Sequence, residues 1–433
     1  MANKKSNILP IVVMYLLFFM IAFVTNLCNP MAVIVKNNFA MSNFAAQLGN
    51  AANFIAYAAM GIPAGMLLKK IGYRKTALVA ILVGFVGVFL QYMSGWAAIQ
   101  SFWVYLAGAF TAGFCMCMLN TVVNPMLNTL GGGGNKGNQL VQFGGVCNSL
   151  AAVLVTIIMG SLIADATKAQ IADATPALMI ALGVFAFAFI VLLLVKIPEP
   201  SLESEKVNVE NEKKYSAFSF RHFNLGILAI FLYMGVEVGV PTYVMQYLTT
   251  SPEAATPGLG INAGIVGMIV AVYWLLMLIG RLLGGMIGGK VSSRAQITGV
   301  SILCLVLVLL GMFLPADVMV KMPGIDWATL TVMTAQVPVG VFALILVGLC
   351  TSVMWGGIFN MAVEGLGKYT SIASGAFMTM VCGGGVLIPL QGKLADVFGN
   401  FQMSYIVVLV CTAYILFYAL VGSKNVNKNI PTE

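Results

Sequence analysis

Twelve long apolar stretches, separated by short polar segments, constrain this chain more than any other feature. Crossing the roughly 30 Å of hydrocarbon in a bilayer takes about 20 apolar residues in a helix. Of the 433 residues, 60% are hydrophobic and only 8% are charged, which is too little polar surface to cover a water-soluble particle of this size. The sequence therefore predicts an all-α membrane protein with twelve transmembrane helices, at residues 9–35, 43–68, 76–94, 101–129, 140–164, 176–196, 223–248, 263–289, 296–314, 336–363, 371–392 and 402–422.

A charged segment divides these spans into two sets of six. Residues 197–222 mix Glu and Lys, which is typical of a solvated loop. We therefore expect an N-terminal six-helix bundle over residues 1–196, a cytoplasmic linker over 197–222 and a C-terminal six-helix bundle over 223–433. AGMLLKKIGYR and GGMIGGKVSSR stand at equivalent places in the two halves, and such pseudo-symmetry is typical of transporters.

The formal net charge of +8 reflects the orientation of the chain, and it gives no reason to expect a nucleic acid partner. If the N-terminus is cytoplasmic, most of the 22 Lys and Arg residues fall on the cytoplasmic side, as the positive-inside rule requires. Both termini are then cytoplasmic. The exceptions on the opposite side are Lys36, Lys168, Lys321 and Lys393.

The cysteines and the single histidine give no sign of a metal or a cofactor. All eight cysteines lie in apolar spans, without a CxxC pair or metal-ligand spacing, and we interpret them as small buried apolar residues. His222 lies in the basic linker, so a histidine relay at membrane depth is not available. We expect neither a metal site nor a cofactor.

Glu237 is the only charged residue in the apolar run from Leu225 to Leu248. A carboxylate at bilayer depth is costly unless it faces a cavity, a partner or an ion path. Pro241 follows four residues later and removes the helical donor of the Glu237 carbonyl. A carboxylate and a released carbonyl at one depth predict a solute or ion site. Arg281, in another span, either snorkels to the interface or pairs.

Amides cluster at membrane depth in two further spans. Asn26 and Asn29 lie one helical turn apart in the first span, and Asn120 and Asn124 lie one turn apart in the fourth, beside Pro125. They predict a polar solute site, and the alternative is hydrogen bonding within a packed bundle. Amides with flat aromatic rings suit a neutral polyol, and the further candidates for solute contacts are Gln142, Asn148, Trp274, Trp355 and Asn360.

These residues belong to motifs that resemble a known family. The chain is similar to transporters of the major facilitator superfamily, and within it to the bacterial fucose–galactose–glucose:proton symporters. The pattern L-[EQN]-T-x-x-N-P is met by residues 119–125, and I-F-x-x-A-x-x-G-L-G-K-Y is met by residues 358–369. The superfamily loop motif, which serves conformational change, is matched loosely by Gly65, Lys69, Lys70, Gly72 and Arg74.

The resemblance implies alternating access to a central site in two six-helix bundles and a monosaccharide cargo, a hexose or 6-deoxyhexose. In proton-coupled members, acidic residues stand at the positions of Asn29 and Asn120. An amide cannot exchange a proton near neutral pH. Glu237 is therefore the candidate for coupling to a cation, H⁺ or Na⁺.

Two alternatives keep the same fold: a uniporter, in which Glu237 only binds the sugar, and an exporter of an amphipathic small molecule. The density of amides argues against the exporter, whose cavity would be apolar and aromatic. A membrane-embedded enzyme is disfavoured because no nucleophile–base pair or metal-ligand set lies at membrane depth. We expect a monomeric sugar symporter in the bacterial cytoplasmic (inner) membrane.

Overall fold

The computed structural model describes residues 8–39, 48–162, 170–199, 215–261, 263–326, 329, 331–427 and 429–432. They form two compact units. Unit 1 comprises the described residues of Met1–Phe220, Val363–Met380 and Asn425–Glu433, and unit 2 those of Arg221–Ala362 and Val381–Lys424. The boundary after Phe220 lies within the expected linker, residues 197–222. Val363–Met380 groups with unit 1 although it comes late in the chain.

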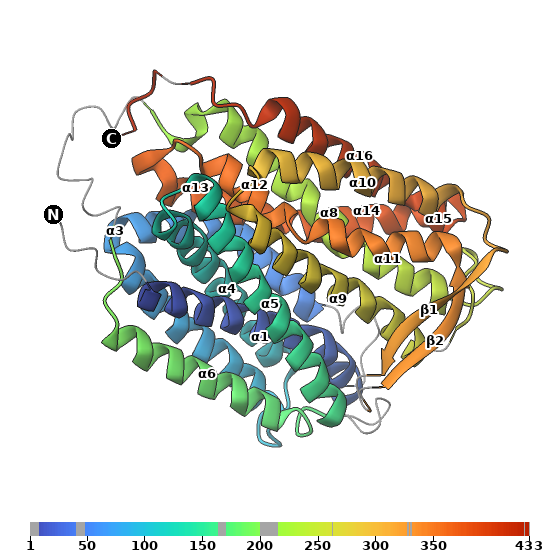
Figure 1. The fold of residues 1–433 in the computed structure, drawn as a ribbon. Helices are drawn as coiled ribbons and strands as arrows, with labels where there is room; N and C mark the ends of the chain where they lie inside the picture. Colours follow the sequence, from blue (N-terminus) through green and yellow to red (C-terminus); the bar gives the residue numbers. More distant parts are fainter. Residues whose placement is uncertain are drawn as a thin grey trace. The chain divides into compact units, whose positions relative to one another are not determined.

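Unit 1 is built from long apolar helices (Figure 1). Its elements are α1 (Ile8–Asn38), α3 (Leu48–Met93), α4 (Phe102–Leu130), α5 (Gly134–Leu162), α6 (Thr175–Leu194), the 3₁₀ turns η1 (Ala217–Ser219) and η2 (Gly367–Tyr369), and α13 (Thr370–Thr379). Within α3, Gly72 has φ 83° and ψ 174°, a conformation that is nearly restricted to glycine. The predicted spans 43–68 and 76–94 are therefore one helix broken at Gly72; residues 43–47 lie outside the described part.

Unit 2 combines helices with one β-hairpin. Its elements are α8 (Arg221–Thr249), α9 (Ala263–Gly288), α10 (Ser293–Phe313), β1 (Met319–Asp326), β2 (Thr331–Pro338), α11 (Val339–Thr351), α12 (Met354–Val363), η3 (Met380–Cys382), α14 (Gly383–Phe398), α15 (Phe401–Ser404), α16 (Ile406–Phe417) and η4 (Tyr418–Gly422). The predicted span 336–363 begins at Val339, since the residues before it complete β2. The predicted span 371–392 is the broken helix α13–η3–α14, which continues to Phe398.

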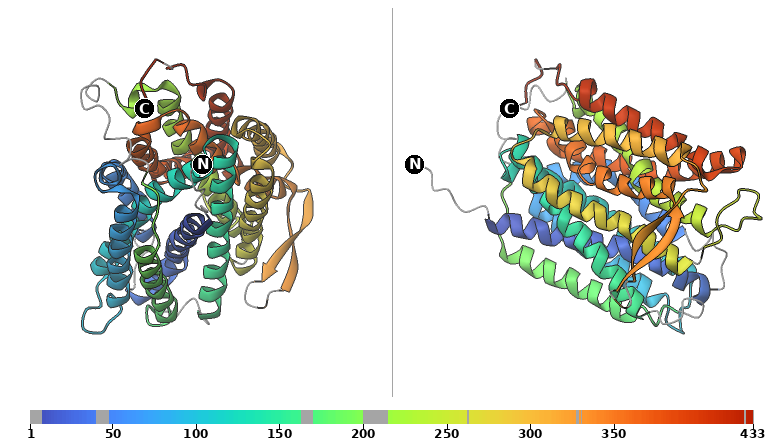
Figure 2. Two further views of the ribbon diagram at one scale, coloured as in Figure 1. Left: turned by 60° about the vertical axis from the view of Figure 1, so that its left-hand side comes forward. Right: turned by 45° about the vertical axis from the view of Figure 1, so that its right-hand side comes forward.

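The hairpin occupies the connection between α10 and α11, where the sequence predicts only a loop. β1 and β2 are antiparallel, with Met319 opposite Pro338 and Asp326 opposite Thr331. β1 packs beside α9, as Figure 2 shows for the orange ribbon. Met322 is buried and its neighbour Lys321 is exposed, which is the alternation of a half-buried strand. The strands are short and lie between much longer apolar spans, so their alternation of buried and exposed residues is not evident from the sequence.

Ten helical segments of the described chain are long and apolar enough to cross a membrane. One of them, Ala51–Met93, is 43 residues long and is divided at Gly72, and α5 supplies a further membrane-length helix of 29 residues. The described helices thus account for the twelve predicted spans. On α6, the exposed face carries Ile180, Phe187 and Leu194 without a charged residue, which suits contact with lipid.

Candidate functional site

The carboxylate of Glu237 on α8 pairs with the guanidinium of Arg281 on α9. Arg281 Nη2 lies 3.4 Å from Glu237 Oε1, and the two side chains are only 14% (Glu237) and 11% (Arg281) exposed. Of the two possibilities that the sequence leaves for Arg281, the structure therefore shows pairing. The pair neutralises a charge that would otherwise be costly in the apolar interior.

Three hydroxyl side chains form a hydrogen-bonded chain that ends at the backbone carbonyl of Glu237. The Tyr273 hydroxyl donates to the Glu237 carbonyl over 3.0 Å and lies 3.2 Å from Thr351 Oγ1. This is the carbonyl that Pro241 deprives of its helical donor, as the sequence predicts, and the new donor comes from α9. The Tyr233 hydroxyl donates to the Thr351 carbonyl over 3.2 Å. Sequence reasoning identified none of these three hydroxyl residues.

The two tryptophans predicted in this half differ in their surroundings. The half-buried ring of Trp355 lies 6.1 Å from that of Tyr233, at 63°, and so belongs to the Glu237 cluster. Trp274 packs edge-on to Tyr273, with ring centroids 5.2 Å apart. Because Trp274 is 37% exposed, it occupies the outer surface of this cluster.

In unit 1, Asn120 and Asn124 form a continuous polar strip on α4. Asn120 Nδ2 donates to the hydroxyl of Tyr57 on α3 over 2.9 Å and to the Met116 carbonyl over 3.1 Å. Asn124 Nδ2 donates to the Asn120 carbonyl over 2.9 Å. Asn124 is fully buried, and Asn120 and Tyr57 are nearly so. The sequence does not reveal Tyr57, because its partner lies on another helix.

The remaining amides are distributed over three helices, α1, α5 and α12. Asn26 Nδ2 donates to the Ala22 carbonyl over 2.8 Å on α1, and the side chain of Asn29 lies outside the described part of the structure. On α5, Gln142 is buried and Asn148 is half-buried. Asn360 Nδ2 on α12 donates over 2.8 Å to Ser293 Oγ, the first residue of α10, so its described contact is at a helix end and not in the Glu237 cluster.

A second backbone carbonyl that loses its helical donor to a proline also accepts a hydrogen bond from a side-chain hydroxyl. Pro125 removes the helical donor of the Thr121 carbonyl, and Ser374 Oγ of α13 donates to that oxygen over 3.1 Å. All three residues belong to unit 1. Helices α4 and α8 therefore share one device, in which a neighbouring helix supplies the hydrogen bond that proline withdraws.

The loop motif forms a network with the start of the linker. The backbone N–H groups of Tyr73 and Arg74 donate to the two carboxylate oxygens of Glu199, at 2.6 and 3.0 Å. The Arg74 guanidinium donates to the carbonyls of Leu192 and Leu193 at the end of α6. No local sequence pattern distinguishes Glu199 from the other acidic residues of the linker.

The other motif residues lie on the same part of α3. Gly65 is buried against α13, where a Cβ would come within 2.9 Å of the Ser371 carbonyl. Lys69 is half-buried and Lys70 is exposed. Gly72 breaks the helix immediately before Tyr73. The backbone N–H groups of Tyr73 and Arg74 are therefore free to donate to the Glu199 carboxylate.

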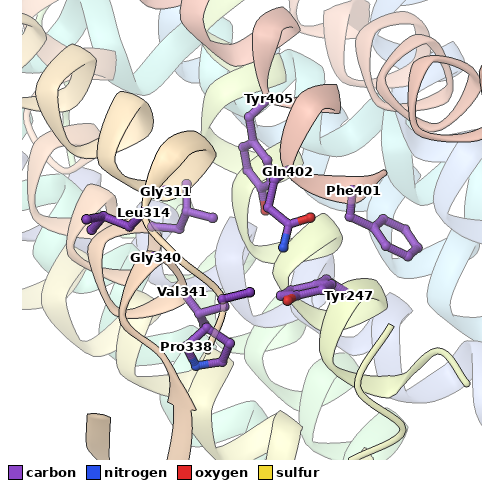
Figure 3. Close-up of a pocket in the computed structure, with 11 residues that line it drawn as sticks. Tyr247, Gly311, Leu314, Pro338, Gly340, Val341, Phe401, Gln402 and Tyr405 are labelled. Atoms are coloured by element: carbon purple, nitrogen blue, oxygen red, sulfur yellow. The ribbon is translucent and has the colours of Figure 1, made fainter. Parts of the chain in front are cut away.

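The two described pockets of unit 2 lie away from these polar clusters. A small pocket, drawn in Figure 3 with Gln402 beside Tyr247, has a volume of about 10 Å³, which is room for about one water molecule. A larger cavity of about 250 Å³ separates α9 from the hairpin and is lined by Ile265, Met268 and Gln336 among others. Neither pocket is lined by a residue that the sequence analysis assigns to the site.

Comparison with known proteins places the chain in a family. The sequence matches the family model "Major Facilitator Superfamily" over residues 14–389. It is 26% identical over 429 residues to the "Glucose/galactose transporter" of Brucella abortus, covering 98% of this chain and 96% of that protein. It is 23% identical over 448 residues to the "L-fucose-proton symporter" of Escherichia coli, covering 98% and 95%.

A solved structure gives the same fold. The transporter FucP, crystallised in the outward conformation, superposes with a TM-score of 0.79 at 22% identity, over 97% of this chain and 100% of that chain. The predicted helical membrane fold is thereby confirmed, as is the expectation of a transporter in place of an enzyme. The chain belongs to the Major Facilitator Superfamily of multi-pass membrane transporters.

Proposed function

We propose that this protein is a permease that carries a neutral monosaccharide, a hexose or 6-deoxyhexose, together with a proton. The observation that carries the proposal is the Glu237–Arg281 pair, 3.4 Å apart and nearly buried, within a ring of hydroxyl and aromatic side chains. The relatives named as glucose/galactose transporter and fucose-proton symporter support the choice of cargo.

The groups around Glu237 suit a sugar. Hydroxyls of Tyr233, Tyr273 and Thr351 both donate and accept hydrogen bonds, and the Trp355 ring offers a flat apolar surface for the C–H face of a pyranose. Unit 1 has a polar strip of its own, Asn120 and Asn124 on α4. An amphipathic cargo would not require this concentration of polar groups at membrane depth.

The neighbouring guanidinium favours H⁺ over Na⁺ as the coupling ion. A sodium ion at the carboxylate would need several oxygen ligands and would be repelled by a cation 3.4 Å from Glu237 Oε1. A proton needs only the carboxylate itself, and protonation releases Arg281 from its partner.

Glu237 would thus replace the acidic groups that the fucose–galactose–glucose:proton symporters have at Asn29 and Asn120. Those amides hold their hydrogens at any physiological pH. In the alternative, a uniporter, the Glu237–Arg281 pair stays ionised throughout the cycle. We further propose a monomer in the bacterial cytoplasmic membrane with both termini cytoplasmic, on the distribution of Lys and Arg.

Transport by purified protein in proteoliposomes tests the proposal. Counterflow with hexoses and 6-deoxyhexoses, varied one at a time, identifies the cargo, and pH and Na⁺ gradients imposed separately identify the ion. We expect an inwardly directed proton gradient alone to drive accumulation of the sugar inside the vesicles. Glu237→Gln should abolish this accumulation but keep counterflow. Glu253→Gln, at an exposed carboxylate, is the matched control and should accumulate sugar normally. Accumulation by Glu237→Gln would refute the coupling role, and counterflow without any driven accumulation would indicate a uniporter.

A further inference from the structure

The cavity between α9 and the hairpin of unit 2 is large and apolar inside. Its volume is about 250 Å³, which exceeds the roughly 150 Å³ of an apolar protein cavity that stays dry and takes up benzene. α9 contributes Ile265, Met268 and Ile269 to the lining, and β2 contributes Met333 and Ala335. The cavity therefore has room for a stretch of hydrocarbon.

Polar side chains lie at the edge of this cavity. Thr334 and Gln336 are the polar side chains of its described lining, and both are exposed. Lys321 lies opposite Gln336 in the strand register and is exposed as well, which gives the edge a cation that suits a phosphate group. A buried water molecule needs about two to four polar partners, so the interior favours hydrocarbon over water.

The hairpin touches α9 along one strand only. A Cβ at Gly324 of β1 would lie 3.1 Å from Met268 Cβ, so β1 lies directly against the helix at this point. Met333 of β2 is opposite Gly324 in the register and lines the cavity. β1 thus holds the hairpin on α9, and β2 stands away from the helix.

The cavity is continuous with a membrane-facing stripe on α9. Ile265 is 37% exposed and Met333 is 42% exposed, so the cavity opens at the surface of unit 2. The stripe follows steps of three and four residues, which keep to one face of a helix, and its members are exposed or half-buried and entirely apolar: Ile265, Met268, Val272, Leu275, Ile279 and Leu282. Hydrocarbon that lies along this stripe therefore reaches the cavity without crossing a polar residue.

We propose that this cavity holds an acyl chain of a membrane phospholipid, with the lipid head at the polar edge formed by Thr334, Gln336 and Lys321. The chain supplies β2 with the packing that α9 does not provide, because an empty apolar cavity forfeits van der Waals contacts on all its walls. On the orientation proposed above, the lipid belongs to the outer leaflet. The site is independent of the cargo and of its coupling ion.

Photolabelling of the full chain in vesicles tests the inference. The protein is reconstituted in phosphatidylethanolamine and phosphatidylglycerol that include a phosphatidylethanolamine with a diazirine in one acyl chain. Light releases nitrogen from the diazirine, the carbene inserts into a neighbouring C–H bond, and mass spectrometry locates the labelled residues. We expect label on Ile269, which is buried and lines the cavity, and none on Val266, which is equally buried on α9 but is not part of the described lining.

A variant that fills the cavity supplies the second readout. Ala335→Phe places a ring in the cavity and should reduce the label on Ile269 to background, while the label on Leu282, at the far end of the stripe, stays unchanged. Val332→Phe is the matched control, because Val332 lies on the same strand, is 75% exposed and is not part of the described lining; it should keep the label on Ile269. If Ala335→Phe does not fold, the comparison of Ile269 with Val266 in the wild-type chain decides.

Three results would overturn the inference. Label on Leu282 without label on Ile269 would mean that lipid covers the stripe but does not enter the cavity. Undiminished label on Ile269 in Ala335→Phe would place the chain outside the cavity. Label on Ile269 from a diazirine-bearing alkane, but not from the phospholipid, would assign the cavity to a small apolar solute.

Discussion

Ser374 Oγ donates over 3.1 Å to the carbonyl of Thr121 and so replaces the hydrogen bond that Pro125 removes from α4. The pair joins residues that are separated by 253 positions in the sequence. It ties α13 to α4 within unit 1 at the level of the asparagine strip.

Removing this hydroxyl should destabilise the protein. Ser374→Ala leaves a buried carbonyl without a donor, and we expect a loss of about 1 to 2 kcal/mol in the free energy of unfolding, measured as a lower thermal midpoint in detergent. Ser301→Ala is the control, because the buried Ser301 hydroxyl has no partner among the described atoms and its removal should be nearly neutral. Equal midpoints for the two variants would show that the contact contributes nothing.

The Glu237–Arg281 pair predicts a non-additive mutant cycle. Glu237→Gln and Arg281→Gln each leave one nearly buried charge without its partner, and each should cost about 3 kcal/mol of stability. The double variant removes both charges and should recover most of that loss. Thermal unfolding measures the cycle, and additive losses would mean that the two side chains do not interact.

Transport by the double variant separates coupling from stability. With no titratable group left in the pair, it should equilibrate sugar across the membrane at a rate that does not respond to an imposed pH gradient. Counterflow at several pH values checks this. A double variant that still concentrates sugar would place the proton site elsewhere.

Tyr273→Phe should weaken both stability and coupling. It removes the donor to the Glu237 carbonyl, at a cost of about 1 to 2 kcal/mol, and it loosens the helix turn that carries the carboxylate. We therefore expect less accumulated sugar per unit of pH gradient. Tyr414→Phe is the control: it removes a similar hydrogen bond, to the Leu225 carbonyl, and should lower stability without changing the accumulation ratio of the sugar. A similar fall in the accumulation ratio of both variants would indicate a general packing effect.

Glu199 should act as a cap for the helix that follows Gly72. Its carboxylate receives two N–H groups that have no helical acceptor, and an anion at a helix N-terminus is favourable. Glu199→Ala should cost about 1 kcal/mol of stability, and Glu199→Gln should cost less because one oxygen remains. The exposed Glu253→Ala is the control for thermal unfolding. A neutral Glu199→Ala would contradict the capping role.

The sequence predicts well those features that a single segment carries. The apolar lengths define the spans, and Pro241 and Pro125 predict which carbonyls are released, because both effects act within about one helical turn. Ser374 and Tyr273, which supply the missing donors, are not predictable in this way. Their role depends on the rotation and packing of neighbouring helices.

The same limit applies to the partners at the site and to the hairpin. Arg281 and Tyr57 are visible in the sequence as polar residues, but only the packing of α9 on α8 and of α3 on α4 assigns their partners. Glu199 caps Tyr73 across a separation of 126 residues, beyond the reach of any local pattern. The strands β1 and β2 are short and lie between long apolar spans, which conceals their alternation.

The neutrality of the Glu237–Arg281 pair has an electrical consequence. While the pair is intact it contributes no net charge, so the empty carrier can reorient without responding to the membrane voltage through these groups. Protonation of Glu237 leaves the positive charge of Arg281, and the loaded carrier then moves one elementary charge, worth about 2.3 kcal/mol per 100 mV. Under the proposed mechanism, voltage would thus drive sugar inward even when the two sides have the same pH.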